Sequence, residues 1–581
     1  MTPTEFPPPS TPNEFISTPT AAPESKMEVG VLFVGAGPAN LAGAIRLMQF
    51  LNNEPALKEA LGEIPVAILE KGKYVGAHLL AGAIFNPVSL KKLFPEIAAG
   101  AFPFQTPVSE EGFYFLSEQK SVRLPLPPTM HNAGNFAISL SRLGKWLAEE
   151  AEKLGVAIFT ETPAVKLLVK NGTVRGVKTG DKSKSRTGVP LSNFQEGIEI
   201  LAKVTVLGEG GQGHLTQSAL AHFGVSRKNP QTFSLGVKEV WELPRPHTSV
   251  IHTMGWPLRG AKQFGEFGGS FLYPMGGNKV SLGLVVGLGY HDTTLSVHDL
   301  LQQMKCHPLF KEILAGGERV AWGAKTIPEG GYYAIPERLA LPGALIVGDG
   351  AGLLNVPALK GIHYAMGSGI IAADTICSAL IGRTNISNNE GECLLAANAS
   401  ILKAGGIFPT DMLTGYDTAV RNSFILKDLY KVRNMRQAFD HGFVPGVILA
   451  GLMTATGGLF PGWQFKTIAD KEMPVAIPVG ATHASPSLHH MDKASSVHLS
   501  GNKSRDDQPN HIRIETHVPE AVGEAWIHMC PANVYEWGKD ETGQKVIRMN
   551  PTNCVQCGAI GAKGGQLTPP EGGSGPEYKD V

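Results

Sequence analysis

The stretch VGVLFVGAGPANLAGAIRL, residues 29–47, decides the fold of the first half of the chain. Val29–Val34 are apolar and suit a buried β-strand, and two glycines, Gly35 and Gly37, follow at once. Apolar residues then recur at helical spacing, and a second apolar strand over 66–69 ends at Glu70. Strand, glycine turn, helix and strand in this order predict a βαβ unit, and therefore an α/β, Rossmann-like fold.

This unit suits a nucleotide. A tight turn needs no side chain at Gly35, and a pyrophosphate can approach the backbone at Gly37 beside the positive end of the following helix. The third fingerprint position is an asparagine instead of a glycine, which weakens the motif. The simpler alternative is an ordinary strand–turn–helix with a surface glutamate. We expect the nucleotide to bind at Gly35, Gly37, Pro38, Ala39, Asn40 and Glu70, with the carboxylate on the ribose hydroxyls.

A later strand, 344–347, ends in Gly348-Asp349-Gly350. A carboxylate between a strand and glycines can bind a polyol, so Gly348 and Asp349 are predicted to hold the ribityl chain of a flavin. A type I turn is the alternative, because it also favours Asp and Gly. Several strand-like runs over 231–290 predict a β-rich substrate domain inserted before this return.

Composition narrows the classes of function. The 581 residues carry a formal net charge of zero, which gives no support to a nucleic-acid partner. Six cysteines are too few for a disulfide scaffold, and Cys306, Cys377 and Cys393 are expected to be ordinary buried thiols. Residues 1–26 are rich in Pro, Thr and Ser, so we expect a disordered tail, with no secretory signal and no clear transit peptide.

One segment, FVPGVILAGLMTATGGLF (443–460), contains no charge. Its length reaches the spanning threshold, but a proline and two adjacent glycines interrupt it. Two interpretations stay open at this point: a buried helical hairpin, or a segment that dips into one membrane leaflet.

Three cysteines lie in the last tenth of the chain: Cys530, which precedes a proline, and Cys554 and Cys557 in a C-x-x-C pair. The pair alone fits a redox dithiol, half a zinc site or half an iron–sulfur site. The Cys-Pro and the x2 spacing resemble ferredoxins, but the next position in the run is Ile560. We therefore expect Cys530, Cys554 and Cys557 to bind iron and sulfide, with structural zinc as the alternative.

Taken together, these features resemble the electron transfer flavoprotein–ubiquinone oxidoreductase family over nearly the whole chain after residue 26. The matching segments are Val34-Gly35-Ala36-Gly37-Pro38-Ala39, Gly76-Ala77-His78 with Gly82-Ala83, His252-Thr253-Met254-Gly255-Trp256-Pro257-Leu258, Gly268-Gly269-Ser270-Phe271-Leu272-Tyr273, Asn355-Val356-Pro357 with Lys360-Gly361, Leu499-Ser500-Gly501 with Asp507-Gln508-Pro509, Cys530-Pro531-Ala532-Asn533-Val534-Tyr535-Glu536 and Pro570-Glu571-Gly572-Gly573.

The resemblance implies a monotopic membrane flavoenzyme that binds FAD and a [4Fe–4S] cluster. It would accept electrons from electron transfer flavoprotein and pass them to ubiquinone. Quinone contacts carry over onto Gly268 and Gly269, where missing side chains let a flat ring approach the backbone. The family's fourth cluster cysteine falls on Ile560, so a three-cysteine cluster, [3Fe–4S] or [4Fe–4S], or none, is expected. The resemblance also favours the membrane for 443–460.

The resulting layout has six regions: a tail (1–26), the FAD-binding domain (27–230), a β-rich quinone-binding domain (231–335), the return of the FAD domain with helices (336–440), a membrane-associated segment (441–465), and a ferredoxin-like cluster domain (466–581). We expect no catalytic side chain, because the cofactors carry the chemistry. The expected location is peripheral, on the inner (cytoplasmic) membrane of a bacterium. Two rivals remain: a cluster-free FAD-dependent reductase of an apolar, isoprenoid or quinone-like substrate, and a zinc-bearing membrane adaptor.

Overall fold

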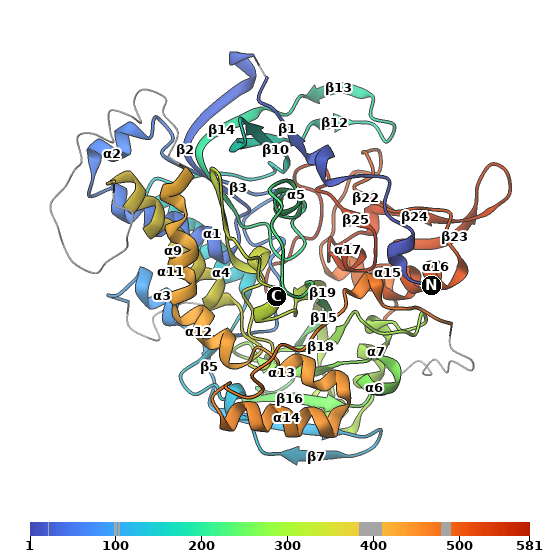
Figure 1. The fold of residues 1–581 in the computed structure, drawn as a ribbon. Coiled ribbons are helices and arrows are strands. Elements are labelled where there is room, and N and C mark those ends of the chain that lie inside the picture. Colours follow the sequence, from blue (N-terminus) through green and yellow to red (C-terminus); the bar gives the residue numbers. More distant parts are fainter. Residues whose placement is uncertain (21, 98–101, 103–104, 383–409, 478–489) are drawn as a thin grey trace.

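The computed structural model describes residues 1–20, 22–97, 102, 105–382, 410–477 and 490–581. Two sheets dominate this described part, one of nine strands and one of seven. In Figure 1 the nine-stranded sheet lies above, the seven-stranded sheet lies below, and the C-terminal region, in red, lies to the right. The mixed α/β architecture confirms the fold class expected from the sequence.

The nine-stranded sheet is built around the predicted βαβ unit. Strand β2 is buried from Val29 to Val34 and pairs in parallel with β3 and β14. Strands buried on both faces must be apolar throughout, which explains the uninterrupted apolar run. The strands of this sheet are β1 (Ile16–Ser17), β10 (Ala164–Lys170), β11 (Thr173–Thr179), β14 (Glu199–Leu207), β2 (Lys26–Val34), β3 (Val66–Leu69), β9 (Ala157–Phe159), β20 (Ala340–Leu341) and β21 (Ala344–Ile346).

Helices α1 (Pro38–Leu51) and α9 (Ile362–Leu380) pack closely beside this sheet. A Cβ built on Gly369 would lie 1.8 Å from the carbonyl oxygen of Ala39, and one on Gly43 would lie 2.9 Å from the carbonyl oxygen of Gly369. The two glycines therefore let the backbones approach. Strand β21 pairs with β14, which returns the chain to the nucleotide domain as the sequence predicts.

The seven-stranded sheet has the order β19-β15-β18-β17-β16-β6-β7. Its strands are β6 (Glu110–Leu116), β7 (Ser121–Leu124), β15 (Phe233–Glu242), β16 (Ser249–Gly255), β17 (Gly268–Pro274), β18 (Lys279–Gly287) and β19 (Glu318–Pro328). The sheet extends beyond the expected range 231–335, because β6 pairs in parallel with β16. A three-stranded sheet adds β4 (Ala83–Phe85), β8 (Phe136–Ile138) and β5 (Gln105–Pro107).

The remaining elements complete the described chain. Its ribbons are β12 (Lys182–Lys184) with β13 (Pro190–Gln195), β22 (Ile512–Arg513) with β25 (Gln566–Leu567), and β23 (Tyr535–Lys539) with β24 (Lys545–Met549). Its other helices are α2 (Pro55–Ala60), α3 (Val88–Leu93), α4 (Leu140–Lys153), α5 (His214–His222), α6 (Ala261–Phe264), α7 (Val297–Met304), α8 (Pro308–Ile313), α11 (Gly415–Asn422), α12 (Phe424–Lys431), α13 (Met435–Ala438), α14 (Phe443–Ala455), α15 (Lys493–Leu499), α16 (Glu520–Met529) and α17 (Ala559–Ala562).

The expectation of a disordered tail over 1–26 is wrong. The side chains of Pro3 and Phe15 are buried, and Phe15 packs edge-on against His214 with ring centroids 5.1 Å apart. Strand β1 pairs in parallel with β10. Two apolar anchors and one strand pairing hold a segment whose composition alone is typical of disorder.

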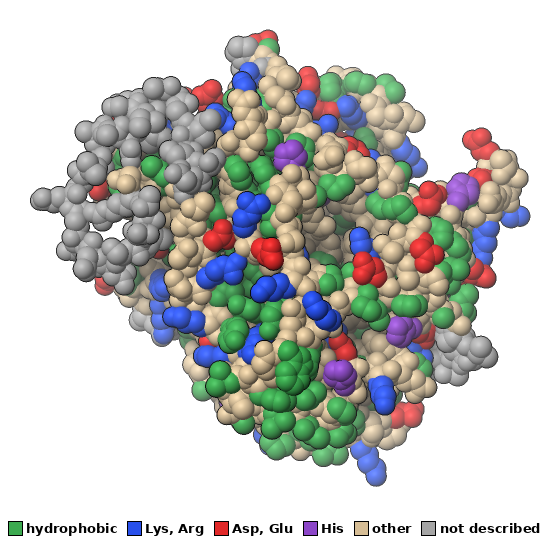
Figure 2. Space-filling view, viewed as in Figure 1, with side chains coloured by type: hydrophobic (Ala, Val, Ile, Leu, Met, Phe, Trp, Pro, Cys, Tyr) green, Lys and Arg blue, Asp and Glu red, His purple; other side chains and the backbone are tan. Residues whose placement is uncertain are grey.

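The uncharged segment is not a buried hairpin, so that alternative is also wrong. Helix α14 buries only Gly446 and Met453, and its apolar side chains face outward. Figure 2 shows hydrophobic side chains gathered at the lower end of the molecule, where Figure 1 places α14. Among the described residues, none of the helices combines the length and the apolar character that crossing a bilayer requires.

Candidate functional site

The glycine turn between β2 and α1 has the geometry of a phosphate-binding loop. Gly35 has φ +95°, and a Cβ there would lie 2.7 Å from the carbonyl oxygen of Gly208. Only glycine suits this position. Gly37 differs, since the nearest atom to a Cβ there would be 3.9 Å away. It precedes Pro38, the first residue of α1, and faces open space. An anion can therefore approach the backbone at Gly37.

Asn40 has a structural role that its place in the fingerprint did not reveal. Its side-chain amide donates hydrogen bonds to the carbonyl oxygens of Val34 and Gly35, both at 2.8 Å. A Cβ on Gly208 would lie within 2.6 Å of that amide group. Asn40 therefore holds the turn through its side-chain amide. The close backbone packing that a third glycine usually allows occurs instead at Gly208, against Asn40, and at Gly43, against α9.

Glu70, at the end of β3, is buried and tied to the same turn. One carboxylate oxygen accepts a hydrogen bond from the Ala36 N–H at 3.0 Å, and the other accepts one from the Gly72 N–H at 2.6 Å. The glutamate is therefore not a surface residue, as the simpler interpretation required. Its place beside Gly35 and Gly37 is where a ribose carboxylate belongs.

Asp349 lies across the sheet from this turn, just after β21. Burial raises the pKa of Asp349 to about 6, and the nearby Lys325 ammonium partly opposes that shift. Gly348 has φ +61° and donates its N–H to the Ser368 hydroxyl at 2.9 Å. Gly348, Asp349 and the glycine turn line the same cavity.

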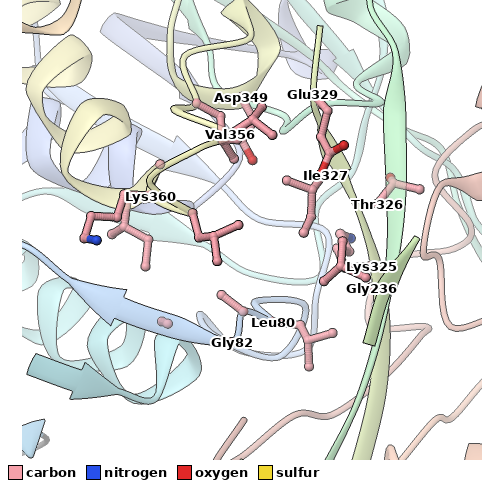
Figure 3. Close-up of a pocket in the computed structure, with 18 of the residues that line it drawn as sticks. Leu80, Gly82, Gly236, Lys325, Thr326, Ile327, Glu329, Asp349, Val356 and Lys360 are labelled. Carbon is pink, nitrogen blue, oxygen red and sulfur yellow. The ribbon is translucent and has the colours of Figure 1, made fainter. Parts of the chain in front are cut away.

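One cavity of about 1270 Å³ connects these residues with the rest of the site. It is larger than the roughly 300–1,000 Å³ typical of small-molecule pockets, so it has room for a dinucleotide and a second ligand. Its walls come from the glycine turn, from strands β15, β17 and β19, and from helix α14. Figure 3 shows Asp349, Lys325 and Glu329 on its walls, with Lys360 on another side.

Gly268 and Gly269 line this cavity, but for a different reason from the one expected. A Cβ on Gly268 would lie 2.0 Å from the carbonyl oxygen of Val285, and one on Gly269 would lie 2.4 Å from that of Thr253. The missing side chains would collide with neighbouring strands and would not fill the cavity. The two glycines are therefore required by the pairing of β17 with β16 and β18.

Sequence reasoning missed an aromatic wall beside these glycines. Phe271 stacks on Tyr273 with ring centroids 4.6 Å apart, and the Tyr273 hydroxyl lies 2.8 Å from Nε2 of His252. Burial lowers the pKa of His252 to about 3, so the imidazole is neutral at pH 7. Alternation along β16 and β17, which places residues 252, 271 and 273 in a sheet, is the signal that could have found them.

The three C-terminal cysteines converge. Cys530, Cys554 and Cys557 line one small pocket together with Ile560, and Cys557 also faces the large cavity. The Val534 N–H donates to the Cys530 sulfur at 3.4 Å. Burial raises the pKa values of all three thiols, so they need a metal to become thiolates.

These residues fit a three-thiolate centre and do not fit a four-thiolate one, because Ile560 is apolar and buried. Within the described residues, no three His, Cys, Asp or Glu side chains are arranged to hold a metal ion. Cys377 is buried in α9, Cys306 is exposed and so differs from its expected burial, and Cys393 lies outside the described residues.

Comparisons with known proteins agree with this site. Residues 233–327 match the family model "ETF-QO, ubiquinone-binding", and residues 488–579 match "Electron transfer flavoprotein-ubiquinone oxidoreductase, 4Fe-4S". A solved geranylgeranyl bacteriochlorophyll reductase-like protein from Thermoplasma acidophilum shares the fold, with TM-score 0.52 and 15% identity over 74% of this chain and 92% of its own.

Relatives named electron transfer flavoprotein-ubiquinone oxidoreductase are similar over almost the full length. The Dictyostelium discoideum protein is 36% identical over 97% of this chain and 93% of its own. The Pseudomonas aeruginosa protein is 36% identical over 96% and 99%, and the Homo sapiens protein is 34% identical over 95% and 89%. The chain belongs to the electron transfer flavoprotein-ubiquinone oxidoreductase family.

Proposed function

We propose that this chain transfers electrons from reduced electron transfer flavoprotein to ubiquinone. The observation that carries this proposal is the shared cavity. The glycine turn, the cluster loop at Cys557, the sheet at Gly268 and helix α14 all face it. Transfer between a flavin, an iron–sulfur centre and a quinone requires these sites to be near one another, and a single cavity meets that requirement.

FAD is proposed to bind through Gly35, Gly37, Pro38, Ala39, Asn40, Glu70, Gly348 and Asp349. The chain's own part would be positioning: the N-terminus of α1 would hold the pyrophosphate, Glu70 would bind the ribose, and Asp349 would bind the ribityl chain. When bound, FAD supplies a centre that accepts electrons singly and releases them in pairs. Cys530, Cys554 and Cys557 are proposed to hold the iron–sulfur centre.

Ubiquinone is proposed to enter beside α14 and to reach the backbone of Gly268 and Gly269. Residues of α14 line the cavity, and several of the same residues, such as Val444 and Ile448, are also exposed on the surface. An apolar tail can thus pass from a lipid leaflet to the sheet without crossing water. We propose peripheral, monotopic attachment to the inner membrane through this helix.

The rivals lack comparable support. A cluster-free reductase would not be expected to match a 4Fe-4S family model over 488–579, and an adaptor would not need an intact flavin cradle. The membership of the family and the cavity both favour the redox enzyme.

The proposal is tested with anaerobically purified protein. We expect flavin absorption, iron and sulfide together, and oxidation of enzymatically reduced electron transfer flavoprotein only when a soluble ubiquinone analogue is present. Flavin without iron and sulfide, combined with no oxidation of that donor, would move the protein to the cluster-free reductases. Zinc in place of iron would favour the adaptor.

A further inference from the structure

Three parts of the chain meet at one residue, Gln556, which lies between two cluster cysteines. Lys71, which directly follows Glu70, donates a hydrogen bond from Nζ to the side-chain oxygen of Gln556 at 2.5 Å. Lys325, on β19, donates from Nζ to the backbone oxygen of Gln556 at 3.1 Å. Gln556 is buried and has φ +51°, so its loop is held in a conformation that non-glycine residues rarely adopt.

The next residue along the sheet extends the same contact. The backbone N–H and the hydroxyl of Thr326 both donate to the carbonyl oxygen of Cys557 at 2.8 Å. The Cys554–Cys557 loop is therefore attached to β19 by Lys325 and Thr326 and to the FAD-binding region by Lys71. The loop cannot move relative to the cavity without breaking these bonds.

Neither lysine has a carboxylate partner. Among the described residues, no salt bridge within 4.0 Å involves Lys71 or Lys325. Lys305 shows the usual arrangement, since its buried ammonium lies 2.9 Å from a carboxylate oxygen of Glu239. Buried cations are normally compensated by such a partner. Burial lowers the pKa of Lys325, and the negative groups that oppose this shift are Cys557, Glu70, Cys554 and Asp349, in that order.

Both ammonium groups also face the space between the cluster loop and the flavin cradle. Lys71, Lys325, Gln556 and Cys557 all line the large cavity, as does Asp349. Figure 3 shows Lys325 on one wall with Asp349 on another. Charges act strongly here, because the surrounding protein screens them less than water does.

We propose that Lys71 and Lys325 are positioning residues that raise the reduction potential of the iron–sulfur centre. Reduction adds one electron and makes the centre more negative, so two cations beside its ligands, neither in a salt bridge with a described carboxylate, stabilise the reduced state. This inference rests on the proposed function, because it requires a centre at Cys530, Cys554 and Cys557. The two lysines would thereby set how readily the iron–sulfur centre accepts an electron relative to the flavin.

The test is a potentiometric titration of the holoenzyme. Electron paramagnetic resonance of the cluster monitors the titration and gives its midpoint potential. Lys325→Gln keeps a hydrogen-bond donor without the charge, and Lys325→Arg keeps the charge. We expect Lys325→Gln and Lys71→Gln each to disfavour reduction about tenfold, a fall of about 59 mV for one electron. Lys325→Arg should keep the wild-type midpoint. The matched control is Lys73→Gln, an exposed lysine two residues from Lys71 that pairs with Glu577.

Two further variants separate the effect of the lysine charges from the effect of the hydrogen bond that attaches the cluster loop to Lys71. Gln556→Met removes the hydrogen bond to Lys71 but leaves both cations, so its midpoint should stay near wild type. Gln556→Glu adds a carboxylate beside Lys71, so its midpoint should fall. If a lysine variant fails to retain iron, the midpoint potential of Gln556→Glu decides the question in its place.

Unchanged midpoints in Lys325→Gln, Lys71→Gln and Gln556→Glu, with iron and sulfide retained, would overturn the inference and leave the proposed function intact. A fall in Gln556→Met equal to that in Lys71→Gln would also overturn it, because the lysines would then act through attachment alone. Absence of iron and sulfide from the unsubstituted protein would overturn the proposed cluster and this inference together.

Discussion

The outward face of α14 should decide membrane binding, and three of its side chains isolate that face. Val444, Ile448 and Leu452 recur every four residues, so they form one stripe along the helix. They are 65%, 59% and 45% exposed, and two of them, Val444 and Ile448, also line the large cavity. Replacing all three with Asp should release the protein from membranes without disturbing its core.

The expected magnitude follows from those exposures. Full burial of a Val, Leu or Ile side chain stabilises by about 1.5–3 kcal/mol. Because the three residues are on average a little more than half exposed, inserting the stripe into lipid contributes roughly 2.5–5 kcal/mol in total. Each 1.4 kcal/mol is a factor of ten. The triple variant should therefore bind vesicles at least on the order of a hundredfold more weakly, before any cost of burying a carboxylate is added.

Co-sedimentation with lipid vesicles measures this change, and quinone and dye reduction are followed in parallel. We expect slower reduction of a long-chain quinone, with dye reduction retained. Vesicle binding is the deciding measurement, because Asp at the cavity-lining positions Val444 and Ile448 would also slow quinone entry. Val189→Asp is the matched control: Val189 is 59% exposed and immediately precedes β13, at the opposite end of the molecule from α14 (Figure 1). If the triple variant and the control bind vesicles equally, α14 is not the attachment site.

Three other predictions address the cofactor sites. Gly37→Val should place a branched side chain where the pyrophosphate approaches, so the protein should fold but purify without yellow colour, which an absorption spectrum checks; retained flavin would contradict the assigned cradle. Because burial raises the pKa of Asp349 from 3.8 to about 6, the folded apoprotein binds this proton more tightly than the unfolded chain. The protonated Asp349 should therefore contribute its full stabilisation below about pH 4 and lose it as the pH rises to about 6. Denaturant titrations across this range should show a smaller fall in the free energy of unfolding for Asp349→Asn than for the unsubstituted protein. Ile560→Cys should make the cluster more stable in air, measured as iron retained over time, while Cys554→Ser should lose iron and sulfide.

Local patterns predicted the nucleotide half of the fold well. The strand at 29–34, the glycine turn, the helix and the strand at 66–69 are read from short-range periodicity, and the structure contains each of them. The same holds for the return at 344–347, where an apolar run ends in a glycine-flanked aspartate. These elements depend on their own residues and on burial from both faces, and both leave a signal in the sequence.

Long-range pairings left no such signal. Strand β6 joins β16 across more than a hundred residues of chain, which extends the quinone-side sheet beyond its expected range. The first 26 residues have a composition typical of disorder, yet Phe15 and the pairing of β1 with β10 anchor them. Gly268 and Gly269 are predicted to contact the quinone, but the sequence does not show that an added Cβ would also collide with the neighbouring strands. In each case the partner is distant in sequence, so no local pattern encodes it.

The same distinction decides how the departure at position 560 should be understood. If the loop had shifted, Ile560 would lie away from the cysteines and another thiol would take its place. Instead Ile560 lines the pocket of Cys530, Cys554 and Cys557, and the two other cysteines that the structure describes lie elsewhere. Its side chain also belongs to the core, since a Cβ on Gly565 would lie 2.6 Å from it. The place of the expected fourth cysteine is therefore taken by the apolar side chain of Ile560, and the proposed cluster would have that side chain beside it.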